Sequence, residues 1–296
     1  MTRRLALLVN PTSGKGRYAG AVAAVADRLS RGDFEVRTLV GADAAESAEL
    51  ADSVVADGYD ALVVMGGDGM VHLATACLAG SSTTLGVVAT GTGNDVARAL
   101  SVPRRKPLDA ADVVVAGRTR RIDVGRAGTT HFASVLAAGF DSRVNERANV
   151  MSWPRGQMRY NLATLAELRV FRPIRYALTL DGETHEVDAM LVAVGNCPSY
   201  GGGLQICAGA EIDDGLLDVV VIRPVSKLEL VKVYPRLFRG THVTHPAYER
   251  HRVRSVTISA ADVVAYADGE RLAPLPITVD VVPAAIDVFA PAAAAP

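Results

Sequence analysis

The chain has 296 residues, of which 49% are hydrophobic, and a formal net charge of −1 at pH 7. This length and apolar content are enough for two hydrophobic cores, and the near-zero charge excludes the broad positive field of a typical nucleic-acid-binding protein. Three cysteines are too few and too scattered for a disulfide framework or a zinc site, and no apolar run reaches the roughly 20 residues of a membrane-spanning helix. We therefore expect a cytoplasmic protein with no nucleic-acid partner.

The first hundred residues alternate between strand and helix patterns. An apolar strand over 5–9 leads into a turn rich in glycine and hydroxyl groups, Asn10-Pro11-Thr12-Ser13-Gly14, and then into a helix over about 19–29. A strand over 34–39 and an Ala/Glu-rich helix over 44–56 follow. Strands and helices that alternate with short connections predict a parallel sheet covered by helices on both faces.

The stretch from 62 to 100 repeats one pattern twice: an apolar strand, a glycine-rich turn and a helix. The turns are Gly66-Gly67-Asp68-Gly69 and Gly91-Thr92-Gly93, and Asn94-Asp95 is the expected N-cap of the second helix. Parallel strands end at the same sheet edge, so both turns would present backbone N–H groups and helix N-termini to a polyphosphate. Two ordinary tight turns of a doubly wound sheet are the alternative.

Asp68 lies inside the first of these turns. A bare carboxylate would repel a phosphate there, so its presence predicts a bridging cation, most simply Mg²⁺. His72, one helical turn further on, is expected on the helix surface.

From residue 122 onward the pattern changes to short apolar or alternating runs, separated by Asp-Gly pairs at 181, 214 and 268. This pattern is typical of an all-β domain. We expect a doubly wound α/β nucleotide-binding domain over 1–124 and a β-sandwich-like domain over 125–296, with the active site in the cleft between them. The last strands could also pack back on the first domain.

Two helical segments interrupt the β pattern, over 142–172 and 227–239. The first combines six arginines, Arg155, Arg159 and Arg169 among them, with Trp153, Tyr160 and Phe171. Basic and aromatic residues on one helix suit an anionic membrane surface. They suit equally well a solvated basic face on an ordinary helix.

Two acidic positions in the β region are candidates for chemistry. Glu211 and Asp214 bring two carboxylates together with free carbonyls, as Mg²⁺ or Ca²⁺ prefers, with Asp213 as a competing ligand. Asp268 sits in an Asp-Gly turn followed by Glu270, which would aim a carboxylate into a cleft. The alternatives are a solvated acidic loop and a plain β-turn.

Together these motifs resemble the signature of the diacylglycerol kinase catalytic superfamily, which includes bacterial soluble diacylglycerol kinases and sphingosine and ceramide kinases. The matching stretches are NPTSG at 10–14, GGDG at 66–69, GTGND at 91–95 with Ala97-Arg98, AGAEIDDGL at 208–216 and YADGE at 266–270. They span nearly the whole chain. NAD kinases and phosphofructokinases also carry GGDG, but the paired GTGND and the late DGE favour lipid kinases.

The resemblance implies ATP-dependent phosphorylation of a lipid hydroxyl, with diacylglycerol as the expected acceptor and peripheral contact at the inner membrane surface. Asp268 would accept the hydroxyl proton, with Glu270 beside it, and Glu211, Asp214 and the Leu216 carbonyl would hold a structural Mg²⁺. The residues implied at the nucleotide are Asn10, Pro11, Thr12, Ser13, Gly14, Thr38, Gly66, Gly67, Asp68, Gly69, Met70, Thr92, Gly93, Asn94 and Asp95.

The chain departs from the family pattern where GGDGT-x-N-E is usual, because Met70, His72 and Leu73 stand at the last positions of that motif. Other readings therefore stay open. The acceptor could be a sphingoid base or another lipid, the chain could be an NAD kinase, or it could be a non-catalytic nucleotide- or lipid-binding regulator. An exposed sheet edge could also pair two copies into a homodimer.

Overall fold

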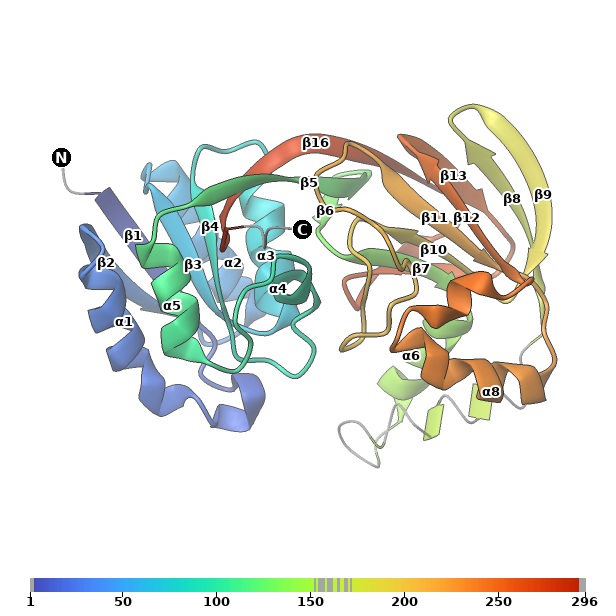
Figure 1. The fold of residues 1–296 in the computed structure, drawn as a ribbon, viewed down its shortest axis with the longest axis horizontal. Coiled ribbons are helices and arrows are strands. Elements are labelled where there is room, and N and C mark those ends of the chain that lie inside the picture. Colours follow the sequence, from blue (N-terminus) through green and yellow to red (C-terminus); the bar gives the residue numbers. More distant parts are fainter. Residues whose placement is uncertain are drawn as a thin grey trace.

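The structure is a computed structural model that describes residues 3–292, apart from 152, 154–157, 159–161, 164, 165, 168, 169 and 171. Within this part of the chain the strands form a ten-stranded and a six-stranded sheet. An N-terminal α/β half and a C-terminal β half lie side by side (Figure 1). The expected combination of an α/β and an all-β half is confirmed.

The N-terminal half contains a four-stranded parallel part of the larger sheet, in the order β2-β1-β3-β4. Helices α1 and α5 pack together, as do α2 and α3, so that helices cover both faces of the sheet (Figure 1). The elements are β1 (Arg3–Val9), η1 (Ser13–Gly16), η2 (Ala19–Ala21), α1 (Val22–Ser30), β2 (Phe34–Val40), α2 (Ala44–Ala56), β3 (Ala61–Gly66), α3 (Asp68–Leu78), β4 (Thr84–Ala89), α4 (Asp95–Ala99) and α5 (Pro107–Val115).

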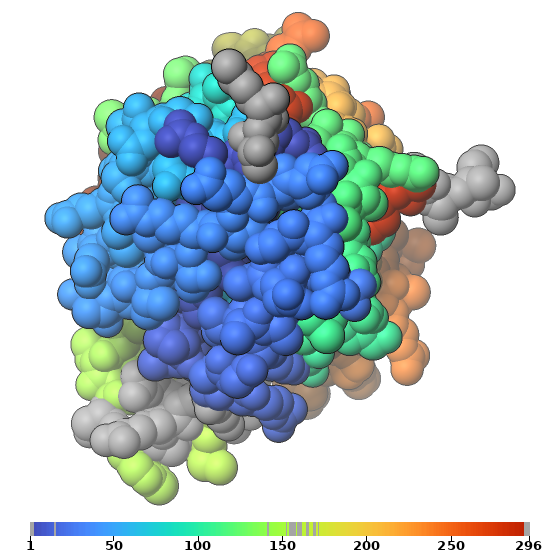
Figure 2. Space-filling model, turned by 90° about the vertical axis from the view of Figure 1, so that its left-hand side faces the viewer, coloured from blue at the N-terminus to red at the C-terminus, as the bar shows by residue number. Residues whose placement is uncertain are grey.

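The local sequence explains these elements. Every residue of β3 is buried, as the central strand of a sheet covered on both faces requires. Helix α2 begins where the Asp43 side chain accepts the N–H of Glu46. Viewed end-on, the N-terminal part of the chain, in blue, forms most of the exposed end of this half (Figure 2).

The C-terminal half is a sandwich of the six-stranded sheet, ordered β12-β11-β10-β7-β14-β15, and the far end of the larger sheet. Leu178 and Ile258 from the larger sheet share one buried core with Val192 and Val219 from the smaller. The elements are β5 (Thr119–Ala127), β6 (Thr130–Phe132), β7 (Val135–Gly139), α6 (Phe140–Val150), β8 (Ile174–Leu180), β9 (Glu183–Ala189), β10 (Leu191–Gly195), β11 (Leu217–Ile222), α8 (Lys227–Leu237), η3 (Thr241–Thr244), β12 (Tyr248–Val253), β13 (Ser255–Ser259), β14 (Val264–Ala267), β15 (Glu270–Pro274) and β16 (Ile277–Phe289).

The long strand β16 runs between the two halves. It pairs antiparallel with β13 and with β5, and its end pairs parallel with β4 through Val288 and Leu85. The arc of β16 beside β5 is visible at the top of Figure 1. These two strands join the sheet of the first half to the sandwich of the second.

Three strands went unforeseen, namely β9, β12 and β15, and each lies at an edge of its sheet. Edge strands carry charged residues that discourage pairing with other chains, so their sequences lack the apolar run of a central strand. The helix expected over 19–29 begins with a 3₁₀ turn.

The basic and aromatic segment over 142–172 is only partly described. Helix α6 covers its first part, whereas Arg155, Arg159, Tyr160, Arg169 and Phe171 lie outside the described residues. Among the helices that the structure does describe, none is long and apolar enough to cross a membrane.

Candidate active site

A cavity of about 600 Å³ lies at the carboxyl ends of β1, β3 and β4. Backbone-rich turns form most of its wall, and Glu270, at the start of β15, reaches it from the C-terminal half. The predicted nucleotide residues that line it are Asn10, Pro11, Thr12, Ser13, Gly14, Gly67, Asp68, Gly69, Met70 and Thr92. Residues 41–44 and Ser47, which follow β2 at the same edge, also line the cavity and were not predicted.

The two glycine-rich turns touch each other through their backbones. A Cβ added to Gly91 would lie 2.4 Å from the Cα of Gly67, and the N–H of Thr90 donates to the carbonyl of Gly66 at 2.8 Å. A Cβ added to Gly69, by contrast, would meet nothing within 4 Å. Gly91 is therefore required by the fold, whereas Gly69 leaves open space.

Asp68, the first residue of α3, links the two turns. Its two carboxylate oxygens accept the N–H groups of Asn94 and Asp95, each at 2.7 Å, and so cap the N-terminus of α4. Burial raises the pKa of Asp68, and these two hydrogen bonds act in the opposite direction. Asn94 is the N-cap residue as expected, but the capping side chain is that of Asp68.

Five of the predicted nucleotide residues do not line the cavity. Thr38 is exposed on β2, and Gly66 is buried at the end of β3. The Asn94 amide donates to the carbonyl of Gly91 at 2.8 Å. The remaining two are Gly93 and Asp95.

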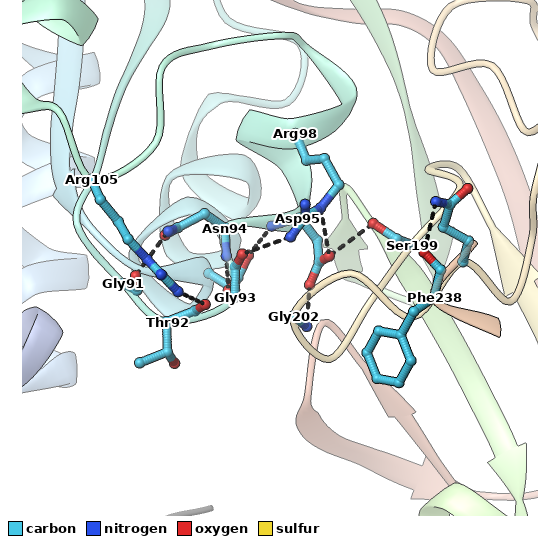
Figure 3. A network of polar contacts seen from close by, with 12 residues as sticks. Gly91, Thr92, Gly93, Asn94, Asp95, Arg98, Arg105, Ser199, Gly202 and Phe238 are labelled. Atoms are coloured by element: carbon cyan, nitrogen blue, oxygen red, sulfur yellow. Dashed lines mark hydrogen bonds and ion pairs between the residues drawn. The ribbon is translucent and has the colours of Figure 1, made fainter. Parts of the chain in front are cut away.

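Asp95 faces the C-terminal half. Its carboxylate accepts the Ser199 hydroxyl and the N–H of Gly202, both at 2.8 Å, and Arg98 lies 3.7 Å away (Figure 3). Asp95 therefore links the turn at 91–95 to the loop that follows β10.

Asp268 occupies the turn between β14 and β15. Both Asp268 and Gly269 have positive φ, of 52° and 89°, which is the conformation of a two-residue hairpin turn. The carboxylate is 4% exposed and accepts hydrogen bonds from the N–H groups of Ala133 and Ser134, the Ser134 hydroxyl and Nδ1 of His72.

The location of His72 differs from the one expected from sequence. The prediction that it lies on the helix surface is wrong, because its Nδ1 lies 3.0 Å from Oδ2 of Asp268 and only 17% of its side chain is exposed. The bond to Asp268 raises the pKa of His72. His72 stands where the family usually has Asn, and this departure from the motif could have singled it out.

The acidic residues of the loop over 208–216 form ion pairs with arginines of neighbouring strands. Asp214 pairs with Arg252 and accepts the N–H of Leu216 at 3.0 Å, Asp213 pairs with Arg120, and Glu211 is exposed. Within the described ranges no group of three or more His, Cys, Asp or Glu side chains is arranged to hold a metal ion. A structural cation at Glu211, Asp214 and Leu216 stays a prediction.

A second cavity, of about 460 Å³, lies between α8 and the outer face of the six-stranded sheet. Its walls are almost entirely apolar and include Met190, Leu204, Ile206, Ile222, Leu237 and Tyr248. A cavity with mostly apolar walls suits a hydrocarbon.

Two known protein families match consecutive parts of the chain. Residues 4–127 match the diacylglycerol kinase catalytic domain, and residues 134–290 match the YegS C-terminal NAD kinase beta sandwich-like domain. The chain is 42% identical to a diacylglycerol kinase of Mycobacterium tuberculosis (strain ATCC 25618 / H37Rv), over 97% of this chain and 95% of the relative. It is 28% identical to a diacylglycerol kinase of Bacillus subtilis (strain 168), over 87% and 86%.

Among solved structures, a diacylglycerol kinase from Bacillus anthracis str. Sterne superposes with a TM-score of 0.77, covering 98% of this chain and 97% of the other at 21% identity. That likeness confirms the fold. The identity to the mycobacterial relative across nearly the full length of both chains shows the family, and the chain is accordingly a lipid kinase that belongs to the diacylglycerol kinase family.

Proposed function

We propose that this lipid kinase transfers the γ-phosphoryl group of ATP, in the presence of Mg²⁺, to the hydroxyl of diacylglycerol, giving phosphatidic acid. The observation that carries the proposal is the pairing of a polar cavity at the glycine turns with an apolar cavity in the other half. The mycobacterial relative is a diacylglycerol kinase, which supports diacylglycerol as the acceptor.

The nucleotide phosphates would lie against the turns at 10–14, 67–70 and 91–92. Backbone N–H groups at the start of α3 and small residues at the wall suit closely approaching phosphate oxygens. Asp68 lines the same cavity, and each of its oxygens keeps acceptor capacity beyond its one backbone hydrogen bond. The residues present therefore fit a divalent cation, which would neutralise charge on the phosphates.

Phosphoryl transfer to an alcohol needs the hydroxyl to be positioned and its proton to be accepted. We assign both tasks to Asp268 and the residues around it. Asp268 lies in the turn between β14 and β15, two residues before Glu270, which lines the nucleotide cavity. The burial and the hydrogen bonds of Asp268 hold its carboxylate in one orientation.

The apolar cavity would hold an acyl chain. A buried cavity of about 150 Å³ takes one benzene ring, or ~25 Å³ per carbon, so 460 Å³ corresponds to about 18 carbons. This space suits one acyl chain of membrane length.

Helix α8 would meet the membrane. Leu228, Val231, Tyr234 and Phe238 are 76%, 57%, 48% and 46% exposed and recur every three or four residues on one face, here called the α8 surface. Lysines and arginines of the same segment suit an anionic lipid layer: Lys227, Lys232, Arg236 and Arg239. A kinase docked there would draw its substrate directly from the lipid.

The test is an assay of the purified chain with γ-labelled ATP, Mg²⁺ and vesicles that carry diacylglycerol, monoacylglycerol, ceramide or sphingosine, with NAD in a parallel reaction. We expect labelled phosphatidic acid as the main product, identified by mass spectrometry. Label on another lipid would correct the acceptor, and label on NAD alone, or on nothing, would overturn the proposal.

A further inference from the structure

The four hydrogen bonds of Asp268 occupy it fully. An ionised carboxylate has about four acceptor positions, and those of Asp268 are filled by two backbone N–H groups, one hydroxyl and one imidazole. With 4% of its side chain exposed, this carboxylate has little surface to offer a lipid hydroxyl. Another group must meet the alcohol if Asp268 drives proton removal.

A second Asp-Gly turn in the same chain shows which hydrogen bonds of Asp268 serve the fold alone. Asp181, in the turn between β8 and β9, also has positive φ, and its carboxylate accepts the N–H groups of Arg254 and Ser255. Binding two consecutive backbone N–H groups is therefore what such a turn does here for the fold. Asp268 differs in that it also binds an imidazole from α3.

The tautomer of that imidazole follows from its partner. Because an ionised carboxylate only accepts hydrogen bonds, Nδ1 of His72 must carry the proton that points at Asp268. In the neutral ring, Nε2 then carries a lone pair. Among the residues that the structure describes, the His72 side chain makes its hydrogen bond through Nδ1 alone, so Nε2 is available.

We propose that Nε2 of His72 takes the proton of the lipid hydroxyl, while Asp268 holds the ring and stabilises the imidazolium. This inference rests on the proposed function. The alcohol O–H bond breaks as the proton passes to Nε2, and the alcohol oxygen bonds to the γ-phosphorus. The bond between that phosphorus and the bridging oxygen breaks, and its electron pair leaves with ADP. The imidazolium returns its proton to water after the product departs.

The location of His72 fits this role. It lies one helical turn after Asp68, which lines the nucleotide cavity, and Glu270, which lines the same cavity, acts on the His72 charge. A paired carboxylate that orients an imidazole and stabilises its charged form is an arrangement that supports general-base catalysis.

The charges around His72 are dominated by acids. Asp268 and Glu270, on the turn and strand that face α3, both favour its protonated form. The titratable groups on the other elements packed against α3 have other neighbours. Asp52 on α2 interacts with Cys77, and Asp95 on α4 pairs with Arg98. Burial and the charge of Arg126 lower the pKa of His131 on β6. The pH dependence of the rate should therefore report the His72–Asp268 pair.

The test replaces the imidazole and then supplies it from solution. In the wild-type assay, activity on lipid must first be present, since its absence would remove the proposed function and not this inference alone. His72→Ala and His72→Gln should then lower kcat about 10²–10³-fold with little change in ATP affinity. Free imidazole added to His72→Ala should restore part of the lost rate.

Two comparisons make the result specific. Asp268→Asn keeps His72, so imidazole should not rescue it, and His185→Ala, an exposed histidine on β9, should retain full activity. The acid limb of the wild-type pH–rate profile should disappear in His72→Gln. A lipid-active wild type with a folded His72→Ala or His72→Gln variant of near-normal rate, or with a deficit that imidazole does not relieve, would overturn the assignment.

Discussion

The Asp95 carboxylate, at the start of α4, accepts a hydrogen bond from the Ser199 hydroxyl of the C-terminal half at 2.8 Å (Figure 3). The other oxygen of Asp95 accepts the N–H of Gly202, and the side chain is only 4% exposed. This clasp connects the turn beside the nucleotide cavity with the half of the molecule that contains the apolar cavity. Asp95 therefore contributes to the relative placement of the two cavities, together with the His72–Asp268 pair and strands β5 and β16.

Removing this carboxylate should loosen the two halves. Hydrogen bonds to charged groups contribute about 1.5–3 kcal/mol each, so Asp95→Ala should lower the free energy of unfolding by about 3 kcal/mol and also reduce kcat. Ser199→Ala leaves Gly202 and Arg98 as partners of Asp95 and should cost only about 1 kcal/mol. Urea unfolding measures both, and equal losses in the two variants would contradict the clasp.

The glycines of the two turns should respond differently to alanine. Gly91→Ala places a Cβ 2.4 Å from Gly67, so a folded protein with normal stability is not expected. Gly69→Ala meets no protein atom within 4 Å and should fold as well as the wild type. If the phosphates approach that backbone, Gly69→Ala should nevertheless bind ATP at least tenfold more weakly, as calorimetry can measure. Normal ATP binding by Gly69→Ala would argue against phosphates at this turn.

The His72–Asp268 pair should make stability depend on pH. The Asp268 partner raises the pKa of His72 above its ordinary value of 6.5. A group whose pKa is raised by folding stabilises the folded state below its unfolded pKa, and this contribution is lost as the pH rises through the folded-state pKa. His72→Gln should therefore cost more stability just below pH 6.5 than in alkaline solution, as denaturant titrations across that range would show. Asp268→Asn should abolish the same pH-dependent difference; a cost that does not vary with pH would mean that the pair is not ionic.

Filling the apolar cavity should select against long acyl chains. Ala247 lines it, and Ala247→Phe would occupy space that a chain otherwise fills. Each methylene that no longer fits loses about 0.8 kcal/mol, so two lost methylenes reduce kcat/KM about tenfold for long-chain lipids. Short-chain diacylglycerol should be affected much less. The matched control is Ala56→Phe at the exposed end of α2, and an equal loss for all chain lengths would place the acyl chain elsewhere.

The fold was predictable from sequence where a local residue pattern determines the structure. The buried run of β3, the capped helix α2 and the glycine turns at parallel strand ends are local patterns, and each lies where it was expected. Edge strands such as β12 were missed, because their charged residues show no apolar face. The cavity at the glycine turns was likewise predictable, since parallel strands end together.

The contacts across the molecule were not predictable. His72 and Asp268 are 196 positions apart, and Asp95 and Ser199 are 104 apart. Nothing in the local sequence of either pair specifies that they meet, because the path of β16 and the register of β14 bring them together. Asp68 illustrates the same limit. A carboxylate in a phosphate-binding turn suggested a cation, whereas its two hydrogen bonds to the start of α4 became visible only in the structure.

The α8 surface should govern access to substrate in membranes. Leu228 and Phe238 are exposed by 76% and 46%, and burying such a side chain in lipid is worth about 1.5–3 kcal/mol. The double variant Leu228→Gln/Phe238→Gln should therefore bind anionic vesicles at least tenfold more weakly, as co-sedimentation measures. Its activity on vesicle-borne diacylglycerol should fall in parallel, whereas its activity on a soluble short-chain analogue should not.

A matched control separates this surface from general hydrophobicity. Val40 on β2 is 53% exposed, and β2 lies at the opposite end of the molecule from α8 (Figure 1). Val40→Gln should bind vesicles like the wild type, since that end carries no part of the α8 surface. If Val40→Gln weakens binding as much as the α8 double variant does, or if the double variant binds normally, then the membrane contacts a different face and the substrate reaches the apolar cavity by another route.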